Sequence, residues 1–119
     1  MLQRKTVEPD TLSLIYSLQE KEYTQSFLLV GGTALALQLG HRTSTDIDFF
    51  TNERFDVPDL LTSLQLDYTV EIRQQMRHAL LTMINTVKTD FVFQPSDMIE
   101  QPFISEQVRM ASLKEIAAM

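Results

Sequence analysis

Two aspartates separated by one residue, Asp46 and Asp48, stand in a run of strand-forming residues that continues into Phe49-Phe50. Alternation along a strand sends both carboxylates to one face and the apolar residues between and after them to the other. Residues two apart on a strand lie about 6.5 to 7 Å from each other, so both carboxylates can reach a shared pair of divalent ions. Magnesium prefers such hard oxygen ligands. The alternative is a solvated strand face, but aspartate is disfavoured in strands.

A third carboxylate stands in a second strand-like run, Thr86 to Phe93, where Asp90 is the sole acid among β-branched and aromatic residues. It could complete a metal-binding triad with the Asp-x-Asp pair. Taken alone, Asp90 is better interpreted as a strand-end aspartate that faces water. Lys88 precedes it by two positions and therefore shares its face, where it could meet a phosphate or pair with Asp90.

A Gly-Gly pair lies upstream of these acids, between an apolar strand-like run and a helix-like one. Gly31 and Gly32 follow Phe27-Leu28-Leu29-Val30 and precede Thr33. Glycine permits positive φ and close approach of a ligand, and the free N–H groups of a helix start attract phosphate. Thr33 could cap the helix or donate to phosphate. An ordinary strand-to-helix connection is the alternative, since short glycine motifs are weak signals.

His41-Arg42 is the basic pair best placed between this helix and the Asp-x-Asp strand. Its side chains could meet a phosphate or form a solvated loop pair, and the sequence leaves both interpretations open.

Residues 29–37 and 41–50 together resemble the nucleotidyltransferases of the AbiEii/AbiGii toxin family, within the DNA polymerase β-like superfamily. Those proteins combine a Gly-Gly turn, a short helix, a basic-plus-serine stretch and an Asp-x-Asp strand. The resemblance implies an α/β fold with a small mixed β-sheet flanked by helices. It also implies transfer of a nucleoside monophosphate from a nucleoside triphosphate to an RNA or protein acceptor, with an antitoxin protein as a partner, in toxin–antitoxin or phage-defence systems.

The resemblance assigns roles to the candidate residues. Two Mg²⁺ ions would be held by Asp46, Asp48 and Asp90. The triphosphate would lie over the diglycine turn, with the binding residues Gly31, Gly32, Thr33 and Arg42.

The last ten residues, 110–119, resemble the family's next landmark, which in the family continues into a lysine and a longer helical segment. We therefore expect a single domain over residues 1–119 that is C-terminally truncated relative to the family. A catalytically incomplete nucleotide- or metal-binding module of the same fold is the main alternative. A phosphohydrolase using the same carboxylates ranks last, because the chain has only two histidines.

Composition narrows the classes of function further. The chain has 119 residues, a 44% hydrophobic content and a net charge of −6, which suits one domain with a core and argues against a sequence-independent grip on nucleic acid. No apolar run approaches the ~20 residues that cross a bilayer, so a cytoplasmic location is expected. The absence of cysteine excludes disulfides and thiolate metal sites. A sheet lacking its covering segment would favour a homodimer.

Periodicity and turn residues predict the elements that position these side chains. The first helix should span about 10–23, with Pro9 ahead of an N-cap Asp10. A hairpin should form from 79–85 and 87–93. The other expected elements are strands at 26–30, at 45–51 and around 68–72, and helices at 32–39, from Pro58 onward and after a capping box of Ser112 and Glu115.

Overall fold

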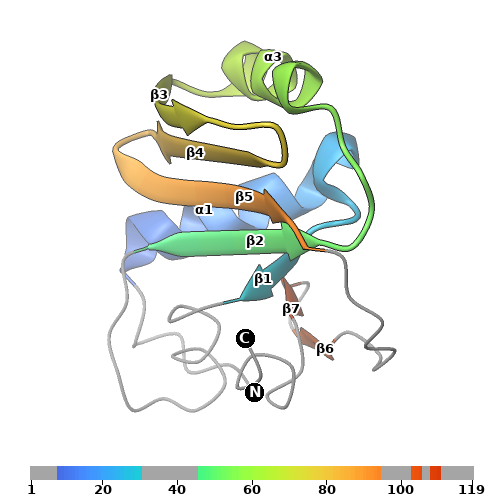
Figure 1. Ribbon diagram of the computed structural model, residues 1–119. Coiled ribbons are helices and arrows are strands. Elements are labelled where there is room, and N and C mark those ends of the chain that lie inside the picture. The colour runs from blue at the N-terminus through green and yellow to red at the C-terminus, as the bar shows by residue number, and fades with distance from the viewer. Residues whose placement is uncertain (1–7, 31–45, 95–102, 106–107, 111–119) are drawn as a thin grey trace.

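The computed structural model describes residues 8–30, 46–94, 103–105 and 108–110 (Figure 1). Its elements in chain order are α1 (Pro9–Glu20), the 3-10 helix η2 (Glu22–Thr24), β1 (Leu28–Val30), β2 (Ile47–Thr51), α3 (Val57–Asp67), β3 (Val70–Gln75), β4 (Ala79–Ile84), β5 (Val87–Phe93), β6 (Phe103–Ser105) and β7 (Val108–Met110). Within these ranges no helix is long and apolar enough to cross a membrane. The helices predicted at 32–39 and after Ser112 lie outside the described residues.

The strands form one mixed sheet in the order β3-β4-β5-β2-β1-β7-β6. The pairs β2–β5 and β1–β7 are parallel, and the other neighbouring pairs are antiparallel. The expectation of an α/β fold with a mixed sheet is confirmed. The parallel β2–β5 pair matters most for function, because it joins the two runs that carry the candidate acids.

The core fills the space between one face of this sheet and the helices; α1 runs behind the strands in Figure 1. Phe91 of β5 stacks on Phe49 of β2 with ring centroids 5.5 Å apart, and meets Phe27 edge-on at 5.4 Å. Ile15 and Leu18 of α1 are fully buried in the same cluster. The odd-numbered residues of β2 and β5 thus point into the core, and alternation directs Asp48 and Asp90 to the other face.

The predicted hairpin is confirmed as β4 and β5, joined by the two residues Asn85 and Thr86. Both have positive φ, 48° and 71°, as a type I′ turn requires. Asparagine tolerates this region well, whereas a β-branched threonine does not. The hairpin forms because the flanking strands pair along their full length despite this unfavourable turn residue.

The two long helices begin differently. Asp56 caps α3 by accepting a hydrogen bond from the backbone N–H of Asp59 at 2.9 Å, and proline occupies the first turn as expected. In α1 the prediction of Asp10 as N-cap is wrong: Glu8 is the N-cap, without a side-chain cap, and Pro9 opens the helix. Proline's fixed φ suits the first helical position, so the N-cap lies two residues earlier than the aspartate suggested.

The short strand β7 was not predicted, and α1 holds it in place. The side-chain amide of Gln19 donates to the backbone carbonyl of Arg109 at 3.2 Å and accepts from its N–H at 3.3 Å. The Arg109 guanidinium donates back to the carbonyls of Gln19 and Thr24. Burial lowers the pKa of Arg109. These are contacts between residues about 90 positions apart, so local sequence patterns carry no signal for them.

Candidate active site

Asp48 and Asp90 are direct neighbours on the parallel strands β2 and β5, where their Cα atoms are register partners. Register partners on adjacent strands point to the same face of a sheet. On its other side Asp48 is paired with Val30, the last residue of β1. The structure therefore brings two of the three predicted acids side by side, next to the strand that leads into the diglycine.

Asp46 directly precedes β2 and lies near the same face. Its carboxylate is 4.0 Å from the ammonium of Lys88, and both side chains are about half exposed. The ion pair of Lys88 is thus with Asp46, whereas the sequence suggested Asp90 as its acidic partner; Asp90 is paired with Arg73 instead. At this distance and exposure the pair of Lys88 with Asp46 contributes little to stability.

Arg73 is the residue of this face that sequence patterns missed. Its Nη2 and Nη1 atoms both donate to Oδ1 of Asp90, at 3.0 and 3.2 Å. Arg73 belongs to β3, and β4 lies between β3 and β5. The pairing register of β3 with β4 shifts between Ile72 and Gln74, at Arg73 itself, and such irregularities re-aim side chains. A basic residue in an exposed strand carries no local sign of this contact.

The electrostatics of the paired acids follow from their burial and their proximity. Burial is the main cause that raises the pKa of Asp48, and the negative charge of Asp90 adds to it. Burial also raises the pKa of Asp90, while Arg73 and then Lys88 act in the opposite direction. A nearby cation would favour the ionised forms of these two carboxylates, which repel each other on one face of the sheet.

The donor set suits a hard divalent cation, because it consists of carboxylate oxygens with unfavourable mutual charge. However, in the described ranges no three acidic, histidine or cysteine side chains are so arranged that they could hold a metal ion as they stand. Arg73, not a third carboxylate, is the closest recorded partner of Asp90. The metal-ligand roles of Asp46, Asp48 and Asp90 stay predictions.

The predicted nucleotide-binding residues Gly31, Gly32, Thr33 and Arg42 lie outside the described residues. The residue that precedes Gly31 in the sequence, Val30, is described, and it pairs with Asp48. The diglycine therefore directly follows a residue that neighbours a candidate acid.

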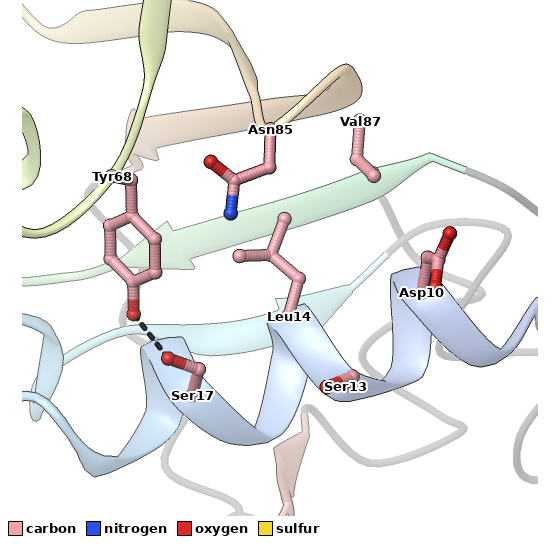
Figure 2. Close-up of a pocket in the computed structure, with 7 residues that line it drawn as sticks. All are labelled: Asp10, Ser13, Leu14, Ser17, Tyr68, Asn85 and Val87. Carbon is pink, nitrogen blue, oxygen red and sulfur yellow. Dashed lines mark hydrogen bonds between the residues drawn. The ribbon is translucent and has the colours of Figure 1, made fainter.

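A polar hollow of about 400 Å³ lies away from these acids, on the α1 side of the sheet (Figure 2). Ser13 and Ser17 line it from the helix, and Tyr68 and Asn85 line it from the sheet side. Ser17 and Tyr68 share a 2.6 Å hydrogen bond across it. In the part of the chain that the structure describes, no base forms a hydrogen bond with the serine hydroxyl groups of this hollow. A nucleophilic hydroxyl needs such a base, so we assign the hollow no catalytic role.

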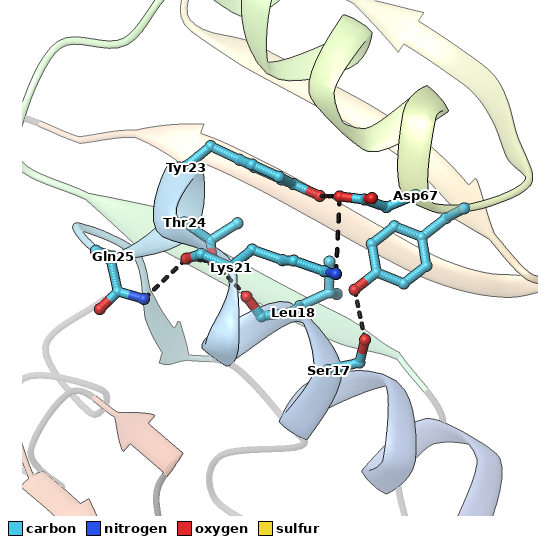
Figure 3. A network of polar contacts seen from close by, with 8 residues as sticks. Ser17, Leu18, Lys21, Tyr23, Thr24, Gln25 and Asp67 are labelled. Carbon is cyan, nitrogen blue, oxygen red and sulfur yellow. Dashed lines mark hydrogen bonds and ion pairs between the residues drawn. The ribbon is translucent and has the colours of Figure 1, made fainter.

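A second polar cluster ties the end of α1 to the end of α3 (Figure 3). The hydroxyl of Tyr23 donates to Asp67 at 2.8 Å, and the ammonium of Lys21 lies 3.7 Å from the same carboxylate oxygen. Burial, followed by the bond to Asp67, raises the pKa of Tyr23 above its usual range. These contacts hold the ends of the two helices together. The raised pKa of Tyr23 therefore follows from a structural contact and does not indicate a catalytic site.

Comparison with known proteins extends this picture. The family model described as "Nucleotidyl transferase AbiEii toxin, Type IV TA system" matches residues 13–119. A curated relative, the uncharacterized protein aq_aa25 of Aquifex aeolicus (strain VF5), is 32% identical over 97 residues, which cover 78% of this chain and 47% of the relative. The chain therefore spans about half the length of this relative.

Solved structures share the fold at low identity. TM1012 of Thermotoga maritima, described as a candidate nucleotidyltransferase, has a TM-score of 0.65 at 13% identity, covering 94% of this chain and 83% of its own. JHP933 of Helicobacter pylori has a TM-score of 0.63 at 16% identity, covering 94% and 56%. The Megavirus polyadenylate synthase has a TM-score of 0.56 at 13% identity, covering 87% and 24%.

Proposed function

Since the chain belongs to the AbiEii nucleotidyltransferase toxin family, we propose that it moves a nucleoside monophosphate from a nucleoside triphosphate to an RNA or protein acceptor. The observation that carries this proposal is the register pairing of Asp48 with Asp90 on one face of the sheet. Membership in the family and the likeness of the fold to solved nucleotidyltransferases support it.

In this proposal Asp46, Asp48 and Asp90 hold two Mg²⁺ ions through their carboxylate oxygens. Bound divalent cations would neutralise the charge that develops on the reacting phosphate and lower the pKa of the attacking hydroxyl. Gly31 and Gly32 with Thr33 and Arg42 bind the triphosphate.

The reaction itself is a displacement at the α-phosphate. The acceptor oxygen forms a bond to the α-phosphorus while the bond to the β-phosphate oxygen breaks, and pyrophosphate leaves. The acceptor hydroxyl loses its proton to solvent. The products are a nucleotide joined to the acceptor, and pyrophosphate.

The remaining parts of the proposal concern partners and setting. A toxin–antitoxin or phage-defence role, an antitoxin protein as partner, a cytoplasmic location and a homodimer are expectations from the sequence, and they stay predictions.

One observation favours a second candidate function, a catalytically incomplete nucleotide-binding module. Asp90 is engaged by Arg73 at 3.0 Å, and no preformed metal cluster exists among the described residues. In such a module the sheet and the nucleotide site would be retained without transfer.

One experiment separates these functions. The chain is incubated with Mg²⁺, each of the four labelled triphosphates and total cellular RNA and protein, beside the Asp46→Ala/Asp48→Ala variant. Asp59→Ala, which removes an exposed acid of α3, is the matched control. Label transfer that is lost only in the double variant supports the transferase.

The other outcomes are equally informative. Triphosphate binding by the wild type without any transfer supports the incomplete module. Release of inorganic phosphate in place of pyrophosphate would indicate a phosphohydrolase.

A further inference from the structure

Arg73 has more hydrogen-bonding capacity than its contact with Asp90 uses. A guanidinium carries five N–H donors, and two of them bond to Oδ1 of Asp90. The structure gives Arg73 no other hydrogen bond to the residues that it describes, which leaves three donors for another partner. A side chain in this position can hold an acid and an anionic ligand together.

The position of Arg73 is also restrained. Its side chain is 28% exposed and that of Asp90 is 15% exposed, so the pair is partly withdrawn from water. Arg73 lies at the register shift of β3, and its side chain reaches across β4 to Asp90. An arginine that is already oriented loses less conformational freedom on binding a ligand than a free surface arginine does.

The charge balance of the face shows which ligand this arginine suits. Asp46, Asp48 and Asp90 carry the negative charge there. The other cation that the structure places beside them, Lys88, forms an ion pair with Asp46 at 4.0 Å, which is longer than a hydrogen bond. A polyphosphate brought to these acids needs positive charge beyond that of any bound cation. Guanidinium groups bind phosphate oxygens through two parallel N–H bonds.

We propose that Arg73 binds the triphosphate of the substrate, and that Asp90 positions it for this contact. This inference rests on the proposed function and deepens it by adding a substrate-binding residue. Both donors used on Asp90 go to one carboxylate oxygen, Oδ1, so the contact leaves Oδ2 without a bond from Arg73. Asp90 can therefore orient the arginine through one oxygen and serve a cation through the other.

The test measures binding of nucleoside triphosphates and of the matching monophosphates by titration calorimetry in Mg²⁺. The variants are Arg73→Gln and Arg73→Lys. Arg77→Gln is the matched control, because Arg77 is an exposed arginine nearby that forms no ion pair with the residues the structure describes. We expect Arg73→Gln to weaken triphosphate binding about 10-fold, the loss typical of a charge-assisted hydrogen bond, and to change monophosphate binding less than about 2-fold.

The Arg73→Lys variant tests the same contact while a positive charge remains at this position. Arg73→Lys keeps the charge, so it should fold like the wild type and give an intermediate loss of triphosphate affinity. Thermal unfolding of each variant shows whether the fold is intact.

Two results would overturn the inference while leaving the proposed function in place: unchanged triphosphate affinity in both Arg73 variants, or equal losses for triphosphate and monophosphate, which indicate a structural role. Failure of the wild type to bind any triphosphate would instead refute the proposed function, and the inference with it.

Discussion

Arg73 and Asp90 meet across an intervening strand, with Nη2 of Arg73 3.0 Å from Oδ1 of Asp90. Arg73 comes from β3 and Asp90 from β5, and β4 separates them. The pair lies beside Asp48, the register partner of Asp90 on β2, and the ion pair of Asp46 with Lys88 lies further along the same two strands. The chemistry proposed for this protein depends on the charges of these side chains.

Replacing Asp90 by asparagine should lower nucleotidyl transfer by at least about 100-fold, since the change removes one charge from the proposed metal site and keeps its shape. The measurement is the initial rate of label transfer at saturating triphosphate. Asp67→Asn serves as the control, because Asp67 binds Tyr23 and Lys21 away from this face. Transfer by Asp90→Asn at more than a tenth of the wild-type rate would contradict the assignment.

The raised pKa of Asp48, caused first by burial and then by the charge of Asp90, gives a pH dependence with a definite sign. The folded state holds this proton more tightly than the unfolded chain. Stability from this group is therefore full at low pH and falls as pH rises from about 4 through the folded-state pKa. The Asp48→Asn variant cannot ionise at this position and therefore does not lose this stability. The melting temperature of the variant should rise relative to that of the wild type as pH increases.

Thermal unfolding of both proteins between pH 3.5 and 8 measures this difference. Added Mg²⁺ should raise the melting temperature of the wild type near pH 7.5, and less near pH 4, because the raised pKa values of Asp48 and Asp90 favour their protonated forms as the pH falls. A constant difference between the two proteins across this range would show that Asp48 titrates normally.

Thr86→Gly should stabilise the protein by about 0.5 to 1 kcal/mol, because Thr86 has a φ of 71° and glycine adopts positive φ without steric cost. Urea unfolding measures the change. Thr86→Ala keeps a Cβ atom and should give a smaller gain. A loss of stability in Thr86→Gly would mean that the threonine side chain stabilises the turn by more than its backbone strain costs.

Phe91→Ala should destabilise the protein by about 3 to 5 kcal/mol, because this fully buried ring packs against two others in the centre of the core. Ile72→Ala, at a side chain that is 48% exposed, should cost about 0.5 kcal/mol or less. Denaturant unfolding of both variants tests the assignment of Phe91 to the centre of the core and of Ile72 to the exposed edge strand β3. Similar costs for the two substitutions would contradict it.

Several elements could be predicted because their signals are local. The β4–β5 hairpin follows from two strand-like runs separated by two turn residues, and α3 follows from a proline in its first turn. The Asp-x-Asp strand follows from alternation around Ile47. Each of these depends on neighbours within a few positions along the chain.

Other features could not be predicted, for an equally physical reason. The strands β6 and β7 have three residues each, which is too short for a periodic pattern, and β7 depends on Gln19 far away in the chain. The start of α1 was misjudged because two adjacent residues, Pro9 and Asp10, both suit a helix start.

By itself the sequence determined which side chains this protein has for phosphate chemistry, the alternation that directs Asp48 to the face opposite Ile47 and Phe49, and the family to which these residues point. Only the tertiary structure decided that β5 pairs in parallel with β2, so that Asp90 stands beside Asp48, and that Arg73 reaches Asp90 across β4. Strand order and register arise from burying one face of the whole sheet at once, and no segment of the chain contains that information alone.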